Sequence, residues 1–71
     1  MARAKFKVES VTKFAKGTQI VMHPVTHGSP ENEKFYQCTP GGELKLEILN
    51  QEVASQFEPG KEYYIDIASA G

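Results

Sequence analysis

Strict alternation of apolar and charged side chains over residues 43–48 constrains this chain more than any other feature of its sequence. Leu44, Leu46 and Ile48 would share one face of a β-strand, and the charged residues between them would face water. In a helix these apolar residues would scatter around the axis, so the alternation outweighs the individual helix preference of Leu and Glu. The segment is therefore predicted to be a strand with one buried face.

Four further segments have the alternation or composition of strands and are separated by turn-forming residues. The first of them changes phase at Val11, which predicts a β-bulge near residues 10–12. A hairpin turn is predicted at residues 15–18, with Gly17 at positive φ. A long polar loop is predicted at residues 26–33. The five predicted strands are residues 5–10, 19–23, 34–39, 43–48 and 62–67.

One segment has helical character instead. Asn50 is a good N-cap for a helix over residues 50–57. Leu49, Val53 and Phe57 share one face of that helix. Through the last two of these residues, the helix is expected to plug an open end of the sheet.

The chain of 71 residues is expected to form a single domain, residues 1–71, with a thin core. The predicted order is β-β-β-β-α-β, with a type II turn at residues 58–61 before the last strand. Short antiparallel connections predict a mainly β fold, either a small five-stranded antiparallel barrel or a curled sheet. The domain is OB-like in size, but its helix follows the fourth strand rather than the third, so the OB topology is not clearly matched.

Composition excludes several classes of protein. Eight basic against nine acidic residues give a net charge of −1, which argues against a dedicated, strongly basic nucleic-acid binder. The single Cys38 cannot form an internal disulfide, which excludes the disulfide-stapled mini-proteins. The apolar runs are too short for a signal peptide or a membrane span, so synthesis in the cytoplasm and no membrane partner are expected.

No group of residues has the spacing of a catalytic or metal site. His23 and His27 are four residues apart, but Pro24 lies between them in a predicted strand end and loop, where this spacing does not bring two imidazoles together. A nucleophile such as Cys38 would need a base beside it in a shielded site, and a domain of this size has little interior to shield one. We therefore expect no enzymatic activity, no metal and no cofactor.

The distribution of charge is the feature that points to a partner. Residues 1–16 carry five basic groups and one acid, whereas the remaining 55 residues carry three lysines and eight acids. Three interpretations of the basic strip stay open: a solvated strand face, a contact with an acidic protein surface, or a path for a nucleic-acid backbone beside stacking aromatic rings. The candidate partner-binding residues are Arg3, Lys5, Lys7, Lys13, Lys16, Tyr36 and Tyr64.

Three stretches of the sequence are distinctive when taken together. They are FKVESVT at residues 6–12, Thr39-Pro40 followed by Leu44-Lys45-Leu46 and Asn50, and FEPGKEYY at residues 57–64 followed by Asp66. With these stretches the chain resembles a group of small, uncharacterised tailed-bacteriophage proteins over almost its whole length. The resemblance implies a phage origin and transfers no catalytic or binding residue.

The leading hypothesis is a non-enzymatic phage binding or structural module. In its most concrete form the chain is a virion accessory or assembly protein that docks on a capsid or another virion protein, with its basic first strand as the docking edge. The alternative is a small barrel that binds single-stranded nucleic acid. A further alternative is an anti-defence protein that inhibits a host factor. The protein would be made in the host cytoplasm and, in the first case, incorporated in the virion; self-association is compatible with all three.

Overall fold

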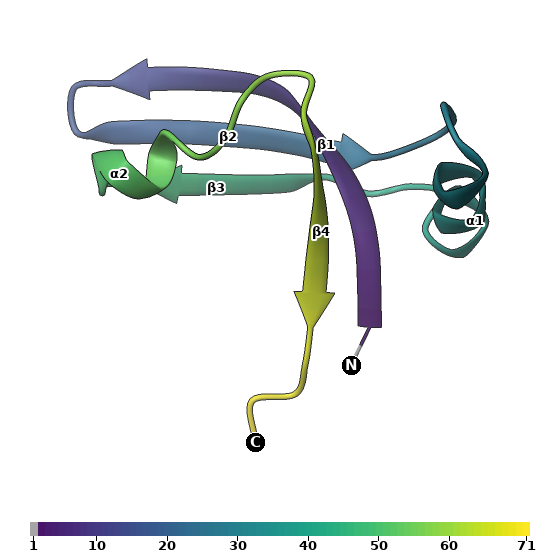
Figure 1. The fold of residues 1–71 in the computed structure, drawn as a ribbon. Coiled ribbons are helices and arrows are strands. Elements are labelled where there is room, and N and C mark those ends of the chain that lie inside the picture. Colours follow the sequence, from purple (N-terminus) through teal and green to yellow (C-terminus); the bar gives the residue numbers. More distant parts are fainter. Residues whose placement is uncertain (1) are drawn as a thin grey trace.

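The computed structural model describes residues 2–71 and has four strands and two short helices (Figure 1). The strands form one curled antiparallel sheet in the order β3-β2-β1-β4. The mainly β, curled-sheet prediction is confirmed, with four strands and two helices in place of the five strands and one helix expected. The elements are β1 (Ala2–Phe14), β2 (Gly17–Pro24), α1 (Pro30–Cys38), β3 (Leu44–Ile48), α2 (Gln51–Ala54) and β4 (Glu62–Ile67).

The long strand β1 organises the sheet. It pairs with β2 from Phe6 to Phe14 but with β4 only from Ala2 to Lys7. The register with β2 shifts between Val8 and Ser10, so the predicted bulge is confirmed close to its expected position. A bulge bends its strand and increases the local twist. In Figure 1 β1 accordingly curves from the group of β2 and β3 into the direction of β4.

The hairpin between β1 and β2 has a two-residue loop, because Phe14 is paired with Gly17. The predicted positive φ at Gly17 is wrong: the described glycines with positive φ are Gly28, Gly42 and Gly60. Gly17 is instead a place of close approach, since a Cβ atom there would lie 3.0 Å from the carbonyl oxygen of Ile48 and equally close to a methyl group of the next leucine. At the other predicted turn, Gly60 has a φ of 85°, as a type II turn requires.

The strand predicted at residues 34–39 is wrong, because α1 occupies most of this segment. Aromatic content suggested a strand, but the start of the segment has the chemistry of a helix N-terminus. The Ser29 side chain accepts a hydrogen bond from the backbone N–H of Asn32 at 3.0 Å, and Pro30 provides the fixed φ suited to the first turn. Acidic side chains in that turn complement the helix dipole. The long loop predicted at residues 26–33 is shortened for the same reason.

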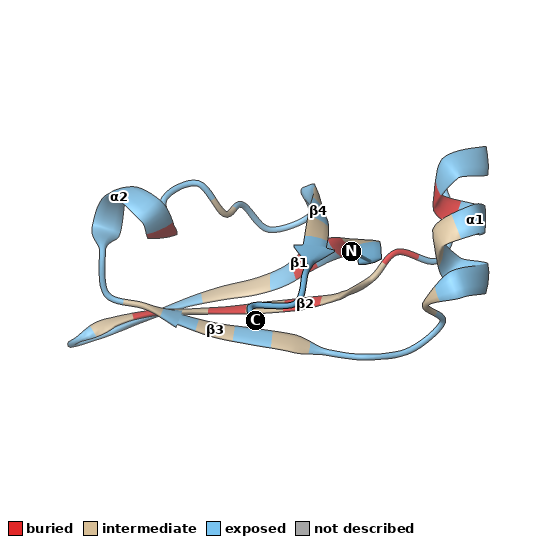
Figure 2. Ribbon diagram, turned by 90° about the horizontal axis from the view of Figure 1, so that it is seen from below, coloured by how far each residue is buried: buried red, intermediate tan, exposed pale blue. Residues whose placement is uncertain are grey.

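The predicted N-cap of the second helix is confirmed, but the helix is short. The Asn50 side chain accepts hydrogen bonds at 2.9 and 3.2 Å from the N–H groups of Glu52 and Val53. α2 then ends at Ala54, and Phe57 packs beyond it against Tyr63, with ring centroids 5.4 Å apart. Figure 2 places α2 over one face of the sheet, where it covers only part of that face.

The core is thin and lies on one face of the sheet. Its buried centre comes from β1 and β2, at Phe6, Val8, Ile20 and Met22 (Figure 2). β3 and β4 line the two sides of this centre but are not hydrogen-bonded to each other, so the sheet is a half-barrel rather than a closed one. Ile67, which alternation predicts to be inside, is 64% exposed at the end of β4. Half-buried apolar side chains complete the core at Ala4, Val11, Leu44, Leu46, Ile48, Phe57, Tyr63 and Ile65.

We expect Gly17→Ala to destabilise the fold by about 1–3 kcal/mol, because the added methyl group would press on the backbone carbonyl of Ile48. The matched control is Gly41→Ala, where the new Cβ meets nothing within 4 Å. That control should be neutral or stabilising by up to about 1 kcal/mol through the unfolded state. Urea unfolding followed by circular dichroism measures both; equal midpoints would contradict the close approach.

Candidate functional site

The seven residues predicted to bind a partner do not form one surface. Arg3, Lys5 and Tyr64 come together where β1 pairs with β4. Lys7 borders a recess on the same strand, and Tyr36 is exposed on α1. Lys13 and Lys16 lie at the β1–β2 hairpin, at the opposite end of the sheet from α1 (Figure 1). The three sets of predicted residues therefore lie in three different surroundings.

Arg3 is neutralised by a carboxylate of the neighbouring strand. Its guanidinium donates two hydrogen bonds to Asp66, at 2.6 and 3.1 Å, and lies 4.9 Å from the centre of the Tyr64 ring. The hydrogen bond from Arg3 holds the pKa of Asp66 below its usual value, and the same bond raises the pKa of Arg3. This bidentate pair ties the first residues of β1 to β4.

Lys5 connects the sheet to α1. Its ammonium group lies 2.7 Å from Glu31 and 3.4 Å from Glu62, and its side chain is only 13% exposed. Tyr64 donates a hydrogen bond to the other oxygen of Glu31 at 2.9 Å and packs on Phe35, with centroids 6.0 Å apart. The Lys5 hydrogen bond, followed by that from Tyr64, lowers the pKa of Glu31. Lys5 and Tyr64 therefore connect α1 to the sheet, while Tyr64 stays about half exposed.

Asn32 is the buried anchor of α1. Its side-chain N–H₂ group donates to the His27 carbonyl at 3.0 Å and to Glu62 at 2.9 Å. Asn32, Glu31 and Glu62 were not among the predicted site residues, since the helix that carries two of them was not expected. The Ser-Pro-Glu sequence at residues 29–31 was the available signal, because it is typical of a helix N-terminus.

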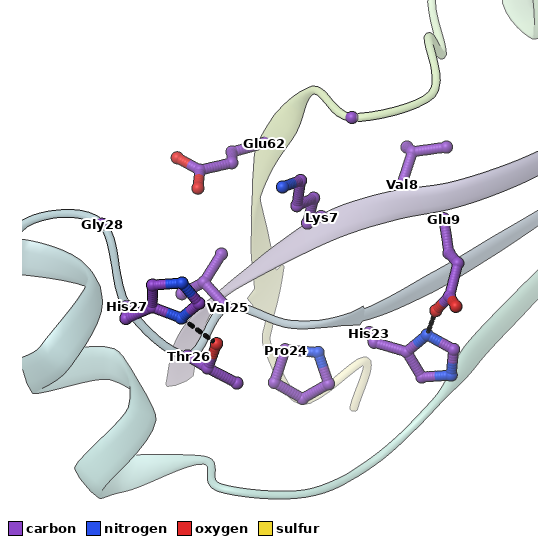
Figure 3. A pocket seen from close by; sticks show the side chains of 11 residues that line it. Lys7, Val8, Glu9, His23, Pro24, Val25, Thr26, His27, Gly28 and Glu62 are labelled. Carbon is purple, nitrogen blue, oxygen red and sulfur yellow. Dashed lines mark hydrogen bonds and ion pairs between the residues drawn. The ribbon is translucent and has the colours of Figure 1, made fainter.

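A shallow recess of about 550 Å³ lies between β1, the end of β2 with the residues that follow it, and the turn at Gly60 (Figure 3). Glu9 is paired with His23 on its wall, and Thr26 is hydrogen-bonded to His27 at 2.7 Å. The threonine and histidine are adjacent in sequence and exposed, and within residues 2–71 no third side chain is hydrogen-bonded to this imidazole. The pair therefore lacks the orienting group and the shielding that nucleophilic catalysis requires.

The described residues contain no group of three His, Cys, Asp or Glu side chains arranged to hold a metal ion. His23 lies between Glu9 and Glu43, on one wall of the sheet. Cys38 is exposed at the end of α1. Neither helix between residues 2 and 71 has the length and apolar character needed to cross a membrane.

The second half of β1 is an open strand edge. Beyond Val8, whose backbone bonds to Gly60 and Lys61, β1 pairs with β2 on one side, and no described strand pairs with its other side. Phe14 near the end of this edge is 59% exposed. Lys13 and Lys16 beside it form no ion pair within residues 2–71. The structure thus places an unpaired backbone, an exposed aromatic ring and free positive charge at one end of the sheet.

Comparison of this chain with protein-family models, with curated proteins and with solved structures finds no match.

The ion pairs around Tyr64 predict acid sensitivity. Because the pKa values of Glu31 and Asp66 are lowered in the folded chain, the stability they contribute is present above their unfolded values, about 4. It is lost as the pH falls through the lower folded values. We expect the urea midpoint to fall between about pH 5 and about pH 3.

The double variant Glu31→Gln/Asp66→Asn should have a lower midpoint at neutral pH and a flatter dependence on pH. Glu33→Gln is the matched control, because Glu33 is on the same helix and has no ion-pair partner in the described part of the chain. An unchanged pH profile in the double variant would contradict the stabilising role of this cluster.

Proposed function

We propose that this chain is a non-enzymatic binding module that docks on a larger protein surface through residues 9–14 of β1. The observation that carries the proposal is the unpaired side of this segment, which no described strand covers. Unpaired strand edges bind extended segments of other proteins by β-strand addition, in which backbone hydrogen bonds supply affinity. Natural edges without such a role are usually short, covered or blocked.

The chemistry of this edge favours an acidic protein partner. Lys13 and Lys16 are free of carboxylates within residues 2–71, and Phe14, which lies between them in the sequence, offers an exposed apolar contact. The docking edge is a different part of the basic first strand from the one that carries Arg3 and Lys5. Those two are engaged by Asp66, Glu31 and Glu62 and are removed from the proposed surface.

In its most concrete form, the proposal is a virion accessory or assembly protein. It is supported by the resemblance of the sequence to small tailed-bacteriophage proteins and by the size of the domain. A single small edge interface has low affinity. Many copies of it on a symmetric shell bind together with much higher overall affinity, because the contacts are multivalent.

A nucleic-acid partner is the second candidate, and one observation favours it. Phe14 lies between Lys13 and Lys16, so one end of the sheet combines an exposed ring with two free cations, as single-strand binding requires. The candidate is weakened because Tyr64 packs against α1, and because Tyr36 lies on the helix at the far end of the molecule (Figure 1). A path that joins several stacking rings to the free lysines is therefore missing from the described residues.

Selection from a library of random peptides of about 12 residues tests the docking edge. We expect enrichment of extended sequences that combine β-branched residues with Asp or Glu, because these match a strand edge with free lysines. In ¹⁵N-labelled protein, a selected peptide should shift the amide signals of residues 9–14. Lys13→Glu/Lys16→Glu should weaken its binding at least about tenfold.

Lys34→Glu is the control, because Lys34 is an exposed lysine on α1 that has no carboxylate partner within residues 2–71; it should bind the peptide like the wild type. No enriched sequence, or shifts confined to another part of the sheet, would overturn the proposal. Tight, salt-sensitive binding of a single-stranded oligonucleotide to the same edge, in place of the peptide, would favour the second candidate.

The virion form has its own measurement. Mass spectrometry of purified particles from the phage that encodes this chain should detect its peptides in amounts that scale with the major shell protein. Their absence from particles, with the protein present in the infected cell, would remove the virion form and leave the docking edge to be explained by a partner in the host cytoplasm.

A further inference from the structure

β3 is a second open edge of the sheet, on the side away from β4. It pairs with β2 over five residues without a register shift, and no described strand covers its outer side. In Figure 1 it is the outermost of the strands that run beside β2, and it is in the foreground of Figure 2. Its edge is thus regular, with neither the bulge nor the proline that commonly blocks pairing.

The charges on β3 lack matched partners across the sheet. Lys45 lies opposite Val21 and Glu47 lies opposite Gln19 in the pairing with β2. Lys45 is 3.5 Å from Glu43, which directly precedes β3, in a long and exposed contact, and Glu47 forms no ion pair within residues 2–71. The side chains of β3 that face water therefore carry one positive and one negative charge, Lys45 and Glu47, and both are accessible to the side chains of another strand.

We propose that a second copy of this chain binds the β3 edge, so that two antiparallel β3 strands pair across a two-fold axis at Leu46. In this register Lys45 lies opposite Glu47 of the second copy, and Glu47 lies opposite its Lys45. On the other face Leu44 lies opposite Ile48 of the second copy, so the apolar faces of the two sheets are continuous. Each opposite-charge pair and each apolar pair stabilises such a ladder.

The charge pattern of β3 favours this register over registers in which the second copy is shifted along the strand. A shift that places Lys45 opposite Lys45 also places Glu43 opposite Glu47, and a shift the other way places Glu47 opposite Glu47. Like charges directly opposite each other destabilise a sheet. A shift by a single residue would instead turn the apolar face of one copy toward water. The edge is therefore self-complementary in one arrangement.

Exposed apolar surface lies beside the β3 edge. An apolar groove of about 330 Å³ runs between the start of β3 and the paired ends of β1 and β4, and Glu43, Leu44, Ile65 and Ile67 are among the residues that line it. Leu49, which is 75% exposed, follows β3 directly. Leu49 of the second copy would come to lie opposite Glu43, just beyond the paired strands.

β4, the other outer strand, does not have a self-complementary charge pattern. Its acids Glu62 and Asp66 are already held by Lys5 and Arg3. Two antiparallel β4 strands centred on Tyr64 would place Glu62 opposite Asp66, which is repulsive. The β3 edge therefore fits a second copy better, and the proposal does not depend on the docking edge of β1.

Charge reversal provides a selective test. We expect the wild-type protein to dimerise between about 10 and about 500 µM in sedimentation experiments. Lys45→Glu and Glu47→Lys each place two like-charge pairs in the interface and should weaken dimerisation at least about tenfold. A mixture of these two single variants should form a heterodimer, because every pair in it is again of opposite charge. The double variant Lys45→Glu/Glu47→Lys should dimerise like the wild type.

Lys34→Glu changes the same charge away from the edge and should leave dimerisation unchanged. Circular dichroism and urea midpoints check that each variant folds. Independently of the variants, isotope-filtered NMR on a mixed labelled sample should give contacts between the Leu46 methyl groups of the two copies. The proposal is overturned if the wild type stays monomeric up to about 500 µM, if the single variants dimerise like the wild type, or if their mixture does not associate.

Discussion

The pairing of β1 with two different strands along its length is the constraint from which the rest of this structure follows. β2 accompanies β1 on both sides of the bulge, but β4 pairs only with the part before it. The bend at the bulge curls the sheet and separates β4 from β3, so the barrel stays half open. The open edge after Val8 follows from the same change of neighbours, because the pairing of β1 with β4 covers only Ala2 to Lys7.

The basic beginning of the sequence serves two different purposes in the folded chain. Before the bulge, Arg3 and Lys5 meet carboxylates of β4 and α1, and they hold these elements against the first half of β1. After the bulge, Lys13 and Lys16 lie beside an unpaired backbone. A charge asymmetry along the sequence therefore does not translate into one charged surface, because the strand that carries it changes its neighbours midway.

Local patterns in the sequence predicted much of the fold. The alternation in β3, the N-cap Asn50 and the Gly60 turn are each determined by a few neighbouring residues, and all three are found in the structure. The aromatic content of residues 34–39 favours a strand, but the helix-start chemistry of Ser29 and Pro30 outweighs it, and α1 forms there instead. The site was less predictable than the fold: Arg3 and Asp66 are 63 residues apart, and their contact follows from the strand order β1-β4, which local patterns do not encode.

The open edges of β1 and β3 differ in charge, and this difference supports the two different roles that we propose for them. β3 combines both signs of charge in a palindromic arrangement, which suits an identical partner, whereas the free end of β1 carries Lys13 and Lys16 and a single acid, Glu9, which is paired with His23. A two-fold dimer through β3 would leave both β1 edges free, one on each copy. Two linked docking edges bind a repetitive surface far more tightly than one, because the second contact forms at a high effective concentration. The proposed self-association at β3 would thus strengthen the proposed docking at β1 without adding a contact to either.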